Sequence, residues 1–407
     1  MTRREHIEAL IREEMAGLPI ERADAAEGHP LVLVPYGADE VLGALDSLLS
    51  TRVTMGEKVR AFEVEWARYC GRSQGVMVNS GSSAVLLMLA AMVELGRLRP
   101  GDEVLCPAVT WSTSLFPIAQ CGLVPVLVDV DPRTLTIDPA SARAAAGPRT
   151  KAVLGVHLLG QPCDLDAFEG LLKLEDACGA HGAVYKGRRV GGIGEAAAFS
   201  FFFSHHITTI EGGMIVTDDG DLADALRSQR AHGWVRERSD RAKWAERFPD
   251  IDPRFLFVSS GYNLRPTEIA GAFGLVQARR LPAWLERRRQ NHADWCAALA
   301  GLVGVFPEAA GTEHAGFAFP MLVEGDRRSL MAHLEAQKIE TRPISGSNLV
   351  CQPAFALVAG ARAPVPLPVA EAVHERGLFV GNHHAFGAAH GDRLRRAIEG
   401  WGAGTAR

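Results

Sequence analysis

Between about residues 30 and 220, short apolar runs of strand length alternate with segments of helical periodicity. The clearest apolar runs lie at residues 76–78, 103–106, 125–129 and 152–156. Strands that alternate with helices in this way form a mostly parallel sheet that is covered by helices on both faces. Ligands of such sheets bind beyond the carboxyl ends of the strands. The turns that follow the strands are therefore where we expect a functional site.

The second half of the chain changes character. Helical patterns cover residues 219–231 and 266–300, and Pro266 suits the first position of a helix. Strand-like segments from about residue 303 and a final helix near 391–402 indicate a smaller α/β lobe. At 407 residues the chain is long enough for two lobes. We predict a helical extension over residues 1–29, a large domain over 30–285 and a small C-terminal domain over 286–407.

Composition excludes several classes of protein. The 43 Lys and Arg against 48 Asp and Glu give a net charge of −5, and the basic residues form no long run, so nucleic acid is not an expected partner. The first 15 residues lack the apolar core of a signal peptide, and the apolar runs are too short to span a membrane. Seven scattered cysteines without a CxxC motif predict no disulfide, zinc site or iron–sulfur cluster. We expect a cytoplasmic protein without membrane association.

The turn after residues 76–78 consists of small residues, Asn79-Ser80-Gly81-Ser82-Ser83, and leads into a helix. Backbone N–H groups at such a turn can approach an anion closely, and the helix N-terminus adds partial positive charge. Gly81 and Ser82 are thus candidates for binding a phosphate. The alternative is a serine that simply caps an ordinary helix.

Two further side chains follow apolar strands. Asp176 stands at the end of one, where its carboxylate would favour the protonated form of a nearby heteroaromatic nitrogen, although an aspartate here is commonly a turn residue or a helix cap. Trp111 follows another and could cover an aromatic ring, although a buried core position is the commoner role of tryptophan.

Residues 199–213 place a polar cluster directly after a very apolar strand, and Ser200, His205 and His206 belong to it. Adjacent histidines could suggest a metal site. Consecutive residues of a strand point to opposite faces, however, and the motif lacks ligand spacing. No metal is expected.

Taken in this order, the motifs resemble those of the DegT-type nucleotide-sugar aminotransferases, which have the aspartate-aminotransferase-like fold of pyridoxal phosphate enzymes (fold type I). The resemblance implies that Ser82 beside Gly81, together with Ser200, holds the cofactor phosphate, that Trp111 stacks on the ring and that Asp176 binds its nitrogen. Asn263 would reach the phosphate from a neighbouring subunit, which implies a homodimer with shared active sites. Further matching segments are Pro35-Tyr36-Gly37, Thr54-Met55-Gly56, Phe62-Glu63 and Gly261-Tyr262-Asn263-Leu264-Arg265-Pro266.

At one position the sequence departs from the aminotransferases of this family. His205 stands where they have the lysine that binds pyridoxal phosphate covalently. Histidine lacks a primary amine, but it can transfer protons near neutral pH. This substitution is similar to that of the sugar 3-dehydratases in the family, as are the segments around Thr54, His232, Arg342 and His383.

The similarity to the dehydratases implies pyridoxamine phosphate as the reactive cofactor and a nucleotide-linked 4-keto-6-deoxyhexose as the substrate, which loses its C3 hydroxyl. L-glutamate would regenerate the pyridoxamine form. His205 would be the proton-transfer residue, and His232 is a second catalytic candidate, although a histidine at a helix end is often only a partner of the helix dipole. A branch with an iron–sulfur cluster is disfavoured, because no cysteine lies between Cys178 and Cys296.

Two features leave other functions open. Gly179 replaces the glutamine that relatives often place near the cofactor's phenolic oxygen, so the partner of that oxygen is not identified. The segment 166–175 is short for both a helix and a strand, so either the helix is reduced or the strand is displaced. The alternatives are another pyridoxal phosphate reaction, such as transamination or a different elimination, and a sugar-nucleotide-binding protein without catalysis. The nucleotide and the sugar stereochemistry are not predicted.

Overall fold

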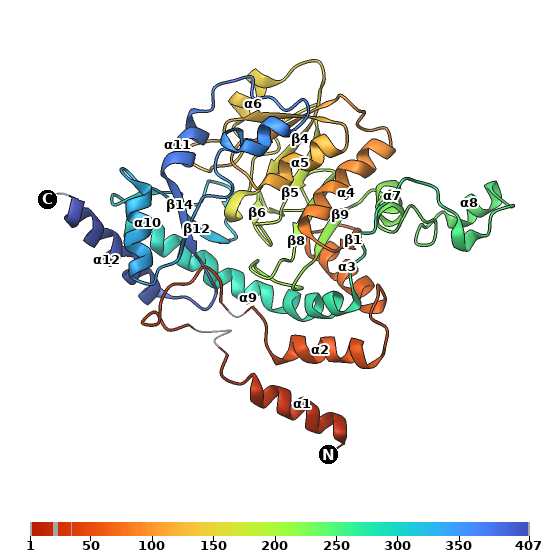
Figure 1. Cartoon of the computed structure of the whole chain (residues 1–407), viewed down its shortest axis with the longest axis horizontal. Helices are drawn as coiled ribbons and strands as arrows, with labels where there is room; N and C mark the ends of the chain where they lie inside the picture. The colour runs from red at the N-terminus through yellow and green to blue at the C-terminus, as the bar shows by residue number, and fades with distance from the viewer. Residues whose placement is uncertain (1, 19–22, 34, 406–407) are drawn as a thin grey trace.

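A seven-stranded sheet forms the centre of the larger part of the molecule (Figure 1). The computed structural model describes residues 2–18, 23–33 and 35–405. The strands are, in spatial order, β1 (Gln74–Val78), β9 (Gly213–Thr217), β8 (Ala196–Ser200), β5 (Leu172–Asp176), β4 (Thr150–Val156), β2 (Glu103–Pro107) and β3 (Val124–Val128).

Strands β8, β5, β4, β2 and β3 are parallel neighbours, whereas β9 runs antiparallel to both β8 and β1. Because β9 opposes both of its neighbours, β1 points the same way as β8. The carboxyl ends of six strands therefore meet at one edge of the sheet. The four apolar runs of the sequence correspond to β1, β2, β3 and β4, and the predicted mostly parallel α/β fold is confirmed.

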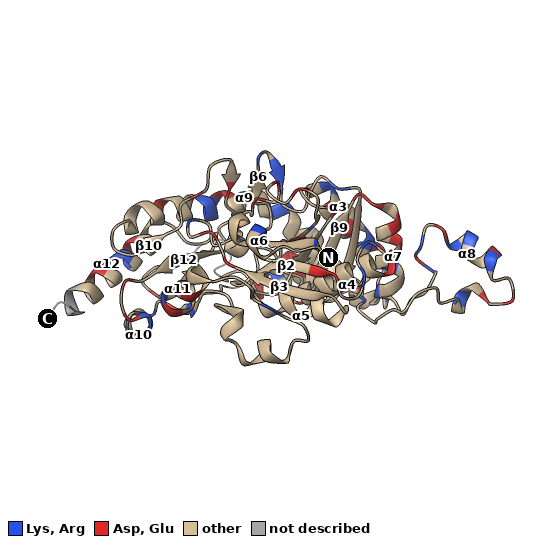
Figure 2. Ribbon diagram, turned by 90° about the horizontal axis from the view of Figure 1, so that it is seen from above, with Lys and Arg blue, Asp and Glu red and all other residues tan. Residues whose placement is uncertain are grey.

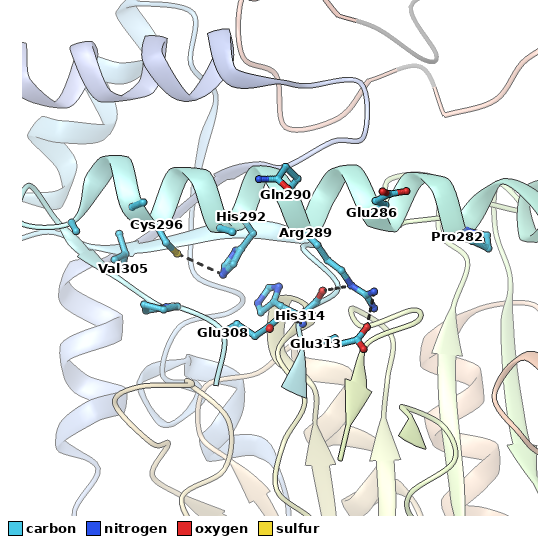
Figure 3. A pocket seen from close by; sticks show the side chains of 14 residues that line it. Pro282, Glu286, Arg289, Gln290, His292, Cys296, Val305, Glu308, Glu313 and His314 are labelled. Carbon is cyan, nitrogen blue, oxygen red and sulfur yellow. Dashed lines mark hydrogen bonds and ion pairs between the residues drawn. The ribbon is translucent and has the colours of Figure 1, made fainter. Parts of the chain in front are cut away.

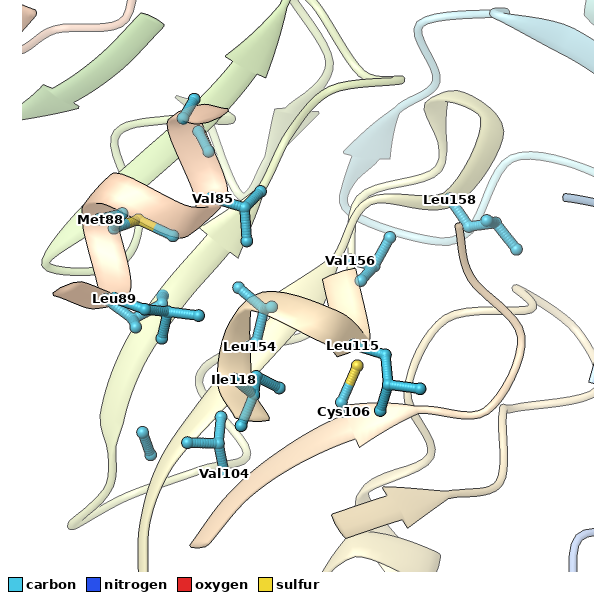
Figure 4. Close-up of a cluster of buried hydrophobic side chains, with 14 of the residues drawn as sticks. Val85, Met88, Leu89, Val104, Cys106, Leu115, Ile118, Leu154, Val156 and Leu158 are labelled. Atoms are coloured by element: carbon cyan, nitrogen blue, oxygen red, sulfur yellow. The ribbon is translucent and has the colours of Figure 1, made fainter. Parts of the chain in front are cut away.

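Helices cover both faces, which explains why the strands are apolar along their whole length. Side chains alternate along β8, so that Ala198 packs on the face that carries α4, while Phe199 packs on the opposite face against Trp66 of α3. Figure 4 shows α4 and α5 packed on the first face through Val85 and Leu115 among others. The helices of this part are α2 (Ala38–Leu49), α3 (Glu57–Tyr69), α4 (Gly81–Glu94), α5 (Ser112–Gln120), α6 (Pro139–Ala145) and α7 (Gly220–Arg230).

The helix α9 (Glu268–Leu299) joins the two parts of the molecule. It packs on α2 and α3 near its start, and Trp295 near its end belongs to the core of the smaller sheet. Its N-cap is Thr267, whose side chain accepts a hydrogen bond from the Ala270 N–H, so Pro266 precedes the helix instead of opening it. The predicted boundary at residues 285–286 falls inside this helix, and the division into domains stays a prediction.

The smaller sheet is antiparallel throughout, in the order β10, β12, β14, β13. A three-stranded ribbon lies beside the larger sheet. The strands of the smaller sheet are β10 (Gly304–Val305), β12 (Ala318–Leu322), β13 (Thr341–Pro343) and β14 (Gly377–Gly381); those of the ribbon are β6 (Val184–Tyr185), β7 (Arg188–Arg189) and β11 (Thr312–Glu313). The accompanying helices are α10 (Arg327–Ala336), α11 (Pro368–Arg376) and α12 (Ala388–Thr405), with the 3₁₀ turns η1 (Leu158–Gly160), η2 (Pro253–Phe255), η3 (Leu349–Cys351) and η4 (Pro353–Leu357).

Two helices lie at the periphery of the molecule. The N-terminal α1 (Arg3–Glu14) has no buried residue, and α8 (Arg241–Arg247) lies on an arm that projects from the molecule, where the Lys and Arg positions are blue in Figure 2. None of the helices within the described residues is long and apolar enough to cross a membrane.

The short segment before Asp176 contains no helix. From Gln161 to Leu171 the chain consists of turns and irregular structure, and β5 then pairs in parallel with β4 and β8. The shortening has therefore removed the helix, and the strand that carries Asp176 keeps its place in the sheet.

Candidate functional site

A cavity of about 910 Å³ lies at the carboxyl ends of the strands and is lined by residues of both parts of the molecule. The residues predicted for the site that line this cavity are Gly81, Ser82, Trp111, Asp176, Ser200 and His205. They come from four separate segments, so the tertiary structure brings them together. His232 and Asn263 do not line it.

The sheet explains why these residues converge. Asp176 and Ser200 end neighbouring parallel strands, and both occupy the alternating positions that face α4 and α5. The N-termini of these two helices lie at the same edge. They bring Ser82 from one side and Trp111 from the other to the cavity.

The N-terminus of α4, where the sequence predicts a phosphate-binding turn, lies at the cavity. Ser80 is the N-cap, and its hydroxyl accepts a hydrogen bond from the Ser83 N–H at 3.1 Å. Ser80 therefore caps the helix, as the simpler alternative predicted. The next two residues, Gly81 and Ser82, nevertheless line the cavity. A Cβ on Gly81 would lie 2.4 Å from the Ser200 Cβ, so only glycine lets the strand end and the helix N-terminus approach this closely. Backbone N–H groups, hydroxyls and the helix dipole together suit an anion.

A chain of hydrogen bonds fixes the Asp176 carboxylate. Ser114 donates to its Oδ2 at 2.7 Å, and the Cys178 N–H donates to its Oδ1 at 3.2 Å. Because the Ser114 proton is used in this way, the Thr110 hydroxyl must donate the 2.8 Å hydrogen bond that joins Thr110 to Ser114. Asp176 is 6% exposed, so its carboxylate is held in a fixed orientation at the wall of the cavity with little access to bulk solvent.

Trp111 is 62% exposed, which excludes the buried core role for this side chain within the single chain. It stands at the N-cap of α5 and lines the cavity. An exposed indole at the edge of a cavity offers a flat apolar face to a bound ring.

His205 lies in the turn that follows β8, and its ring contacts Phe317 with centroids 5.1 Å apart. Its Nδ1 is buried without a hydrogen-bond partner. Burial, together with the nearby Arg288 guanidinium, lowers the pKa of His205 to about 4. The ring is therefore neutral near pH 7, the form that can accept a proton.

The adjacent His206 does not share the cavity. It is buried, and its Nε2 lies 3.1 Å from the Ala315 carbonyl oxygen. The two histidines lie in a turn, so the argument from strand alternation does not apply to them. Their surroundings nevertheless differ, because His205 lines the cavity and His206 is buried outside it. No group of three or more His, Cys, Asp or Glu in the part of the chain that the structure describes is arranged to hold a metal ion.

His232 and Asn263 lie together beyond the end of α7. The His232 N–H donates to the Tyr262 carbonyl at 2.6 Å, and Ala231 bridges to Asn263. Asn263 is exposed, and its Oδ1 accepts a hydrogen bond from the Arg265 Nε at 3.0 Å. Neither side chain contributes to the cavity of its own chain.

The sequence reasoning missed several residues of the cavity. Ser114 fixes Asp176, Glu211 comes from the turn before β9, and Arg342 comes from β13. Arg342 is the one Lys or Arg side chain in the described lining of the cavity, and it forms no ion pair within the described residues. The resemblance of the segment around Arg342 to the dehydratases was the only signal in the sequence that pointed to it.

Gly179, which replaces a glutamine of relatives, also lines the cavity. A Cβ at this position would meet no atom closer than 3.7 Å, the nearest being the Leu159 nitrogen. Glycine is therefore not required here by packing, because a Cβ would make only ordinary van der Waals contacts.

A second cavity, of about 890 Å³, lies along α9 and contains none of the predicted residues (Figure 3). Its arginine, Arg289, is already paired with Glu313 at 2.7 Å and donates to the His314 carbonyl. The first cavity thus combines six of the eight predicted residues with an arginine that forms no ion pair within the described residues, and the second does not.

The chain is similar to known proteins in both sequence and fold. The model of the DegT/DnrJ/EryC1/StrS aminotransferase family matches residues 36–399. The GDP-4-keto-6-deoxy-D-mannose 3-dehydratase of Yersinia pseudotuberculosis is 36% identical over 360 residues, which cover 85% of this chain and 92% of the relative. The dTDP-4-dehydro-2,6-dideoxy-D-glucose 3-dehydratase of Saccharopolyspora spinosa is 35% identical, over 85% of this chain and 81% of the relative.

Among solved structures, a GDP-4-keto-6-deoxymannose-3-dehydratase with a trapped PLP-glutamate geminal diamine superimposes with a TM-score of 0.85. It is 35% identical and covers 91% of this chain and 100% of that chain. Fold and sequence thus point to the same group of relatives.

Proposed function

We propose that this chain, which belongs to the DegT/DnrJ/EryC1/StrS aminotransferase family, is an enzyme that removes the C3 hydroxyl from a nucleotide-linked 4-keto-6-deoxyhexose. One observation carries the proposal: a neutral histidine, His205, lines the cavity in place of the lysine of the aminotransferases, together with the candidate cofactor-binding residues Gly81, Ser82, Trp111, Asp176 and Ser200. The 3-dehydratases among the relatives support the same reaction.

The cavity fits pyridoxamine or pyridoxal phosphate. Gly81, Ser82 and Ser200 surround a helix N-terminus suited to the phosphate, and the close contact at Gly81 leaves no room for a side chain there. Asp176 is oriented to accept a hydrogen bond from the ring nitrogen, and Trp111 offers a face to the ring. Bound in its pyridoxamine form, the cofactor supplies a primary amine for the C4 ketone and a ring that accepts an electron pair.

His205 is the proton-transfer residue of this proposal. Its low pKa keeps the ring neutral at physiological pH, so that one ring nitrogen can accept a proton from the cofactor's C4′ carbon. Asp176 keeps the cofactor nitrogen protonated, since a carboxylate favours the charged form of a neighbouring base. Because His205 has no primary amine, the cofactor is held by non-covalent contacts alone.

Arg342 is available to bind an anionic substrate in the cavity. The cofactor phosphate is served by the serines and the helix N-terminus, so the unpaired guanidinium of Arg342 is free to bind another anion. We assign it to a carboxylate of L-glutamate, which restores the pyridoxamine form of the cofactor. The neighbouring turn of Ser345, Gly346 and Ser347 lies on the same side of the cavity.

We also propose a homodimer with shared active sites. Asn263 is exposed and does not line the cavity of its own chain, which suits a residue that completes the site of a partner subunit. The arm around α8 carries further exposed apolar side chains that a second copy would cover, namely Phe248, Ile251, Phe255 and Phe257. His232 lies at the base of this arm, so any catalytic role of His232 would also be in the partner's site.

The absence of disulfide bonds among the seven cysteines supports a cytoplasmic location. All seven are free, and Cys70, Cys106, Cys163 and Cys296 are buried in apolar surroundings. Unpaired thiols are typical of proteins from a reducing compartment.

The test incubates the purified protein with pyridoxamine phosphate, L-glutamate and a nucleotide-linked 4-keto-6-deoxyhexose. We expect a 3-deoxy-4-keto sugar and one molecule of ammonia per product, identified by mass spectrometry and an ammonia assay. In the Arg342→Gln variant the KM for glutamate should rise while the KM for the sugar changes little; Arg328→Gln, an exposed arginine of α10, is the matched control. An aminated sugar that keeps its C3 hydroxyl would contradict the proposal and favour transamination instead.

A further inference from the structure

Three histidine rings lie next to one another in a row that starts at the cavity and runs into the core. His205 lines the cavity, His181 lies in the turn after β5, and His206 follows His205 in the chain. The His181 and His205 rings are perpendicular with centroids 6.1 Å apart, and the His181 and His206 centroids are 5.1 Å apart. The ring of His181 is fully buried and is also in contact with Trp66.

The hydrogen bonds at the inner end of this row determine which ring nitrogens carry a proton. His206 Nε2 faces the Ala315 carbonyl oxygen, which only accepts hydrogen bonds, so this nitrogen carries the proton. Burial lowers the pKa of His206 well below its usual range, so the ring is neutral and its Nδ1 is an acceptor. His181 Nδ1, 3.1 Å away, must therefore be the donor to it.

This assignment leaves His181 Nε2 as a bare acceptor. Burial also lowers the pKa of His181 well below its usual range, with further contributions from the nearby His205 and Arg288. The Ser200 carbonyl lies near the same ring, but Nε2 has no hydrogen-bond partner. A buried acceptor without a donor is costly, and such an atom calls for an explanation.

His205 supplies the complementary atom. Its Nδ1 is also buried without a partner, and its Nε2 is the nitrogen left to face the cavity. A proton on Nδ1 would pair with the bare Nε2 of His181 and leave Nε2 of His205 free to act as a base. The His181 and His205 rings are about one ångström farther apart than the hydrogen-bonded pair of His181 and His206. Catalytic hydrogen bonds are often long in unliganded enzymes and shorten when the ligand is bound.

We infer that His181 is a positioning residue for His205: its Nε2 accepts a hydrogen bond from Nδ1 of His205 and so fixes the tautomer whose Nε2 is the proton acceptor in the cavity. The inference rests on the catalytic role proposed for His205. His181 stays neutral and serves as an acceptor, and it takes up no proton itself. His206 and the Ala315 carbonyl fix the orientation of His181 in turn.

Two variants separate the hydrogen bonds of His181. In His181→Asn the side-chain amide can still donate to His206, but nothing reaches His205. In His181→Gln the longer side chain places an amide oxygen near the position of Nε2 and restores an acceptor. We expect kcat of the asparagine variant to fall by about tenfold to a hundredfold, a part of the roughly 10²–10⁴-fold that a positioned base contributes. The glutamine variant should regain most of this loss, and the KM for the sugar should change little in both.

A measurement on the protein without cofactor tests the tautomer directly. In ¹⁵N NMR spectra of histidine-labelled protein, protonated and bare ring nitrogens have well-separated shifts, and His205 is assigned by comparison with His205→Asn. We expect the proton on Nδ1 of His205 in the wild type and a mixture of tautomers in His181→Asn. His292→Asn, a buried histidine outside the cavity, is the control that should leave the His205 signals and kcat unchanged.

A proton on Nε2 of His205 in the wild type would overturn the inference, as would equal losses of kcat in the two His181 variants. If the protein lacks dehydratase activity but has the expected tautomer, the proposed function fails and the hydrogen bond stands. The two failures are thus distinguishable.

Discussion

Position 205 decides between two ways of holding a cofactor and moving a proton. A lysine binds pyridoxal phosphate covalently, whereas His205 can only exchange protons with it. The structure adds that the ring lines the cavity and that burial lowers the pKa of His205 to about 4. The acid limb of the pH–rate profile should therefore lie well below the ordinary histidine pKa of about 6.5.

The His205→Lys variant tests the placement of this residue. Because the ring lines the cavity, a lysine amine here should reach bound pyridoxal phosphate and attach to it, giving an absorbance band that borohydride reduction makes permanent. Dehydration should fall by about 10²–10⁴-fold, the usual contribution of a general base. Phe203→Lys, in the same turn but outside the cavity lining, should not attach to the cofactor. Absence of covalent attachment in His205→Lys would mean that residue 205 does not face the cofactor.

At the scale of elements, the site depends on how closely the start of α4 approaches the end of β8. Gly81 opens the helix directly against Ser200, and the hydrogen bond of the Ser80 cap sets the direction of the first turn. At the C-terminal end of α7, the buried Arg230 pairs with Glu63 and Glu237 and holds the start of the segment that contains His232. The contact of Gly81 with Ser200 and that of Arg230 with Glu63 join residues that are far apart in the sequence.

We expect Gly81→Ala to destabilise the protein by about 1–3 kcal/mol, the usual cost of overpacking, because the new methyl group overlaps Ser200. The cofactor affinity should also fall, since relief of the overlap moves the helix N-terminus away from Ser200. Gly220→Ala is a matched control: it also opens a helix, α7, but its Cβ meets nothing within 4 Å. Chemical denaturation and cofactor titration measure both effects, and equal behaviour of the two variants would contradict the steric argument.

At the scale of the whole molecule, many histidines are buried in the neutral form. Burial lowers the pKa of His29 to about 4, although its Nε2 lies 2.8 Å from the Gly381 carbonyl oxygen, and burial lowers the pKa of His292 to about 4 as well. The unfolded chain binds protons at these histidines from about pH 6.5 downward, and the folded protein does so only near pH 4. The free energy of unfolding must therefore decrease as the pH falls from 6.5 to 4.

The His29→Gln variant measures one such contribution. Glutamine can keep the hydrogen bond to Gly381 but does not titrate, so between pH 6 and 5 the stability of the variant should fall less steeply than that of the wild type. The difference in slope should approach about 1.4 kcal/mol per pH unit, the value for one proton. Urea unfolding at fixed protein concentration provides the data. Identical slopes would mean that His29 binds its proton equally in both states.

The sequence alone determined the class of fold, because a parallel sheet covered on both faces requires apolar strands that alternate with helices, and this pattern is local. It also determined the residue types at the ends of the strands, including Gly81, Asp176, Ser200 and His205. The reduced segment before β5 was recognised as short, but only pairing with β4 and β8 decided that the helix was lost and the strand kept its place.

Contacts between distant segments were decided by the tertiary structure. Ser114 fixes Asp176, Arg342 enters the cavity from the smaller sheet, and His181 stands behind His205, and none of these pairs has a characteristic spacing in the sequence. The fold places them together because strand ends and helix starts share one edge of the sheet. Local patterns specify elements and the residues at their ends, whereas the partners of those residues depend on packing across the whole chain.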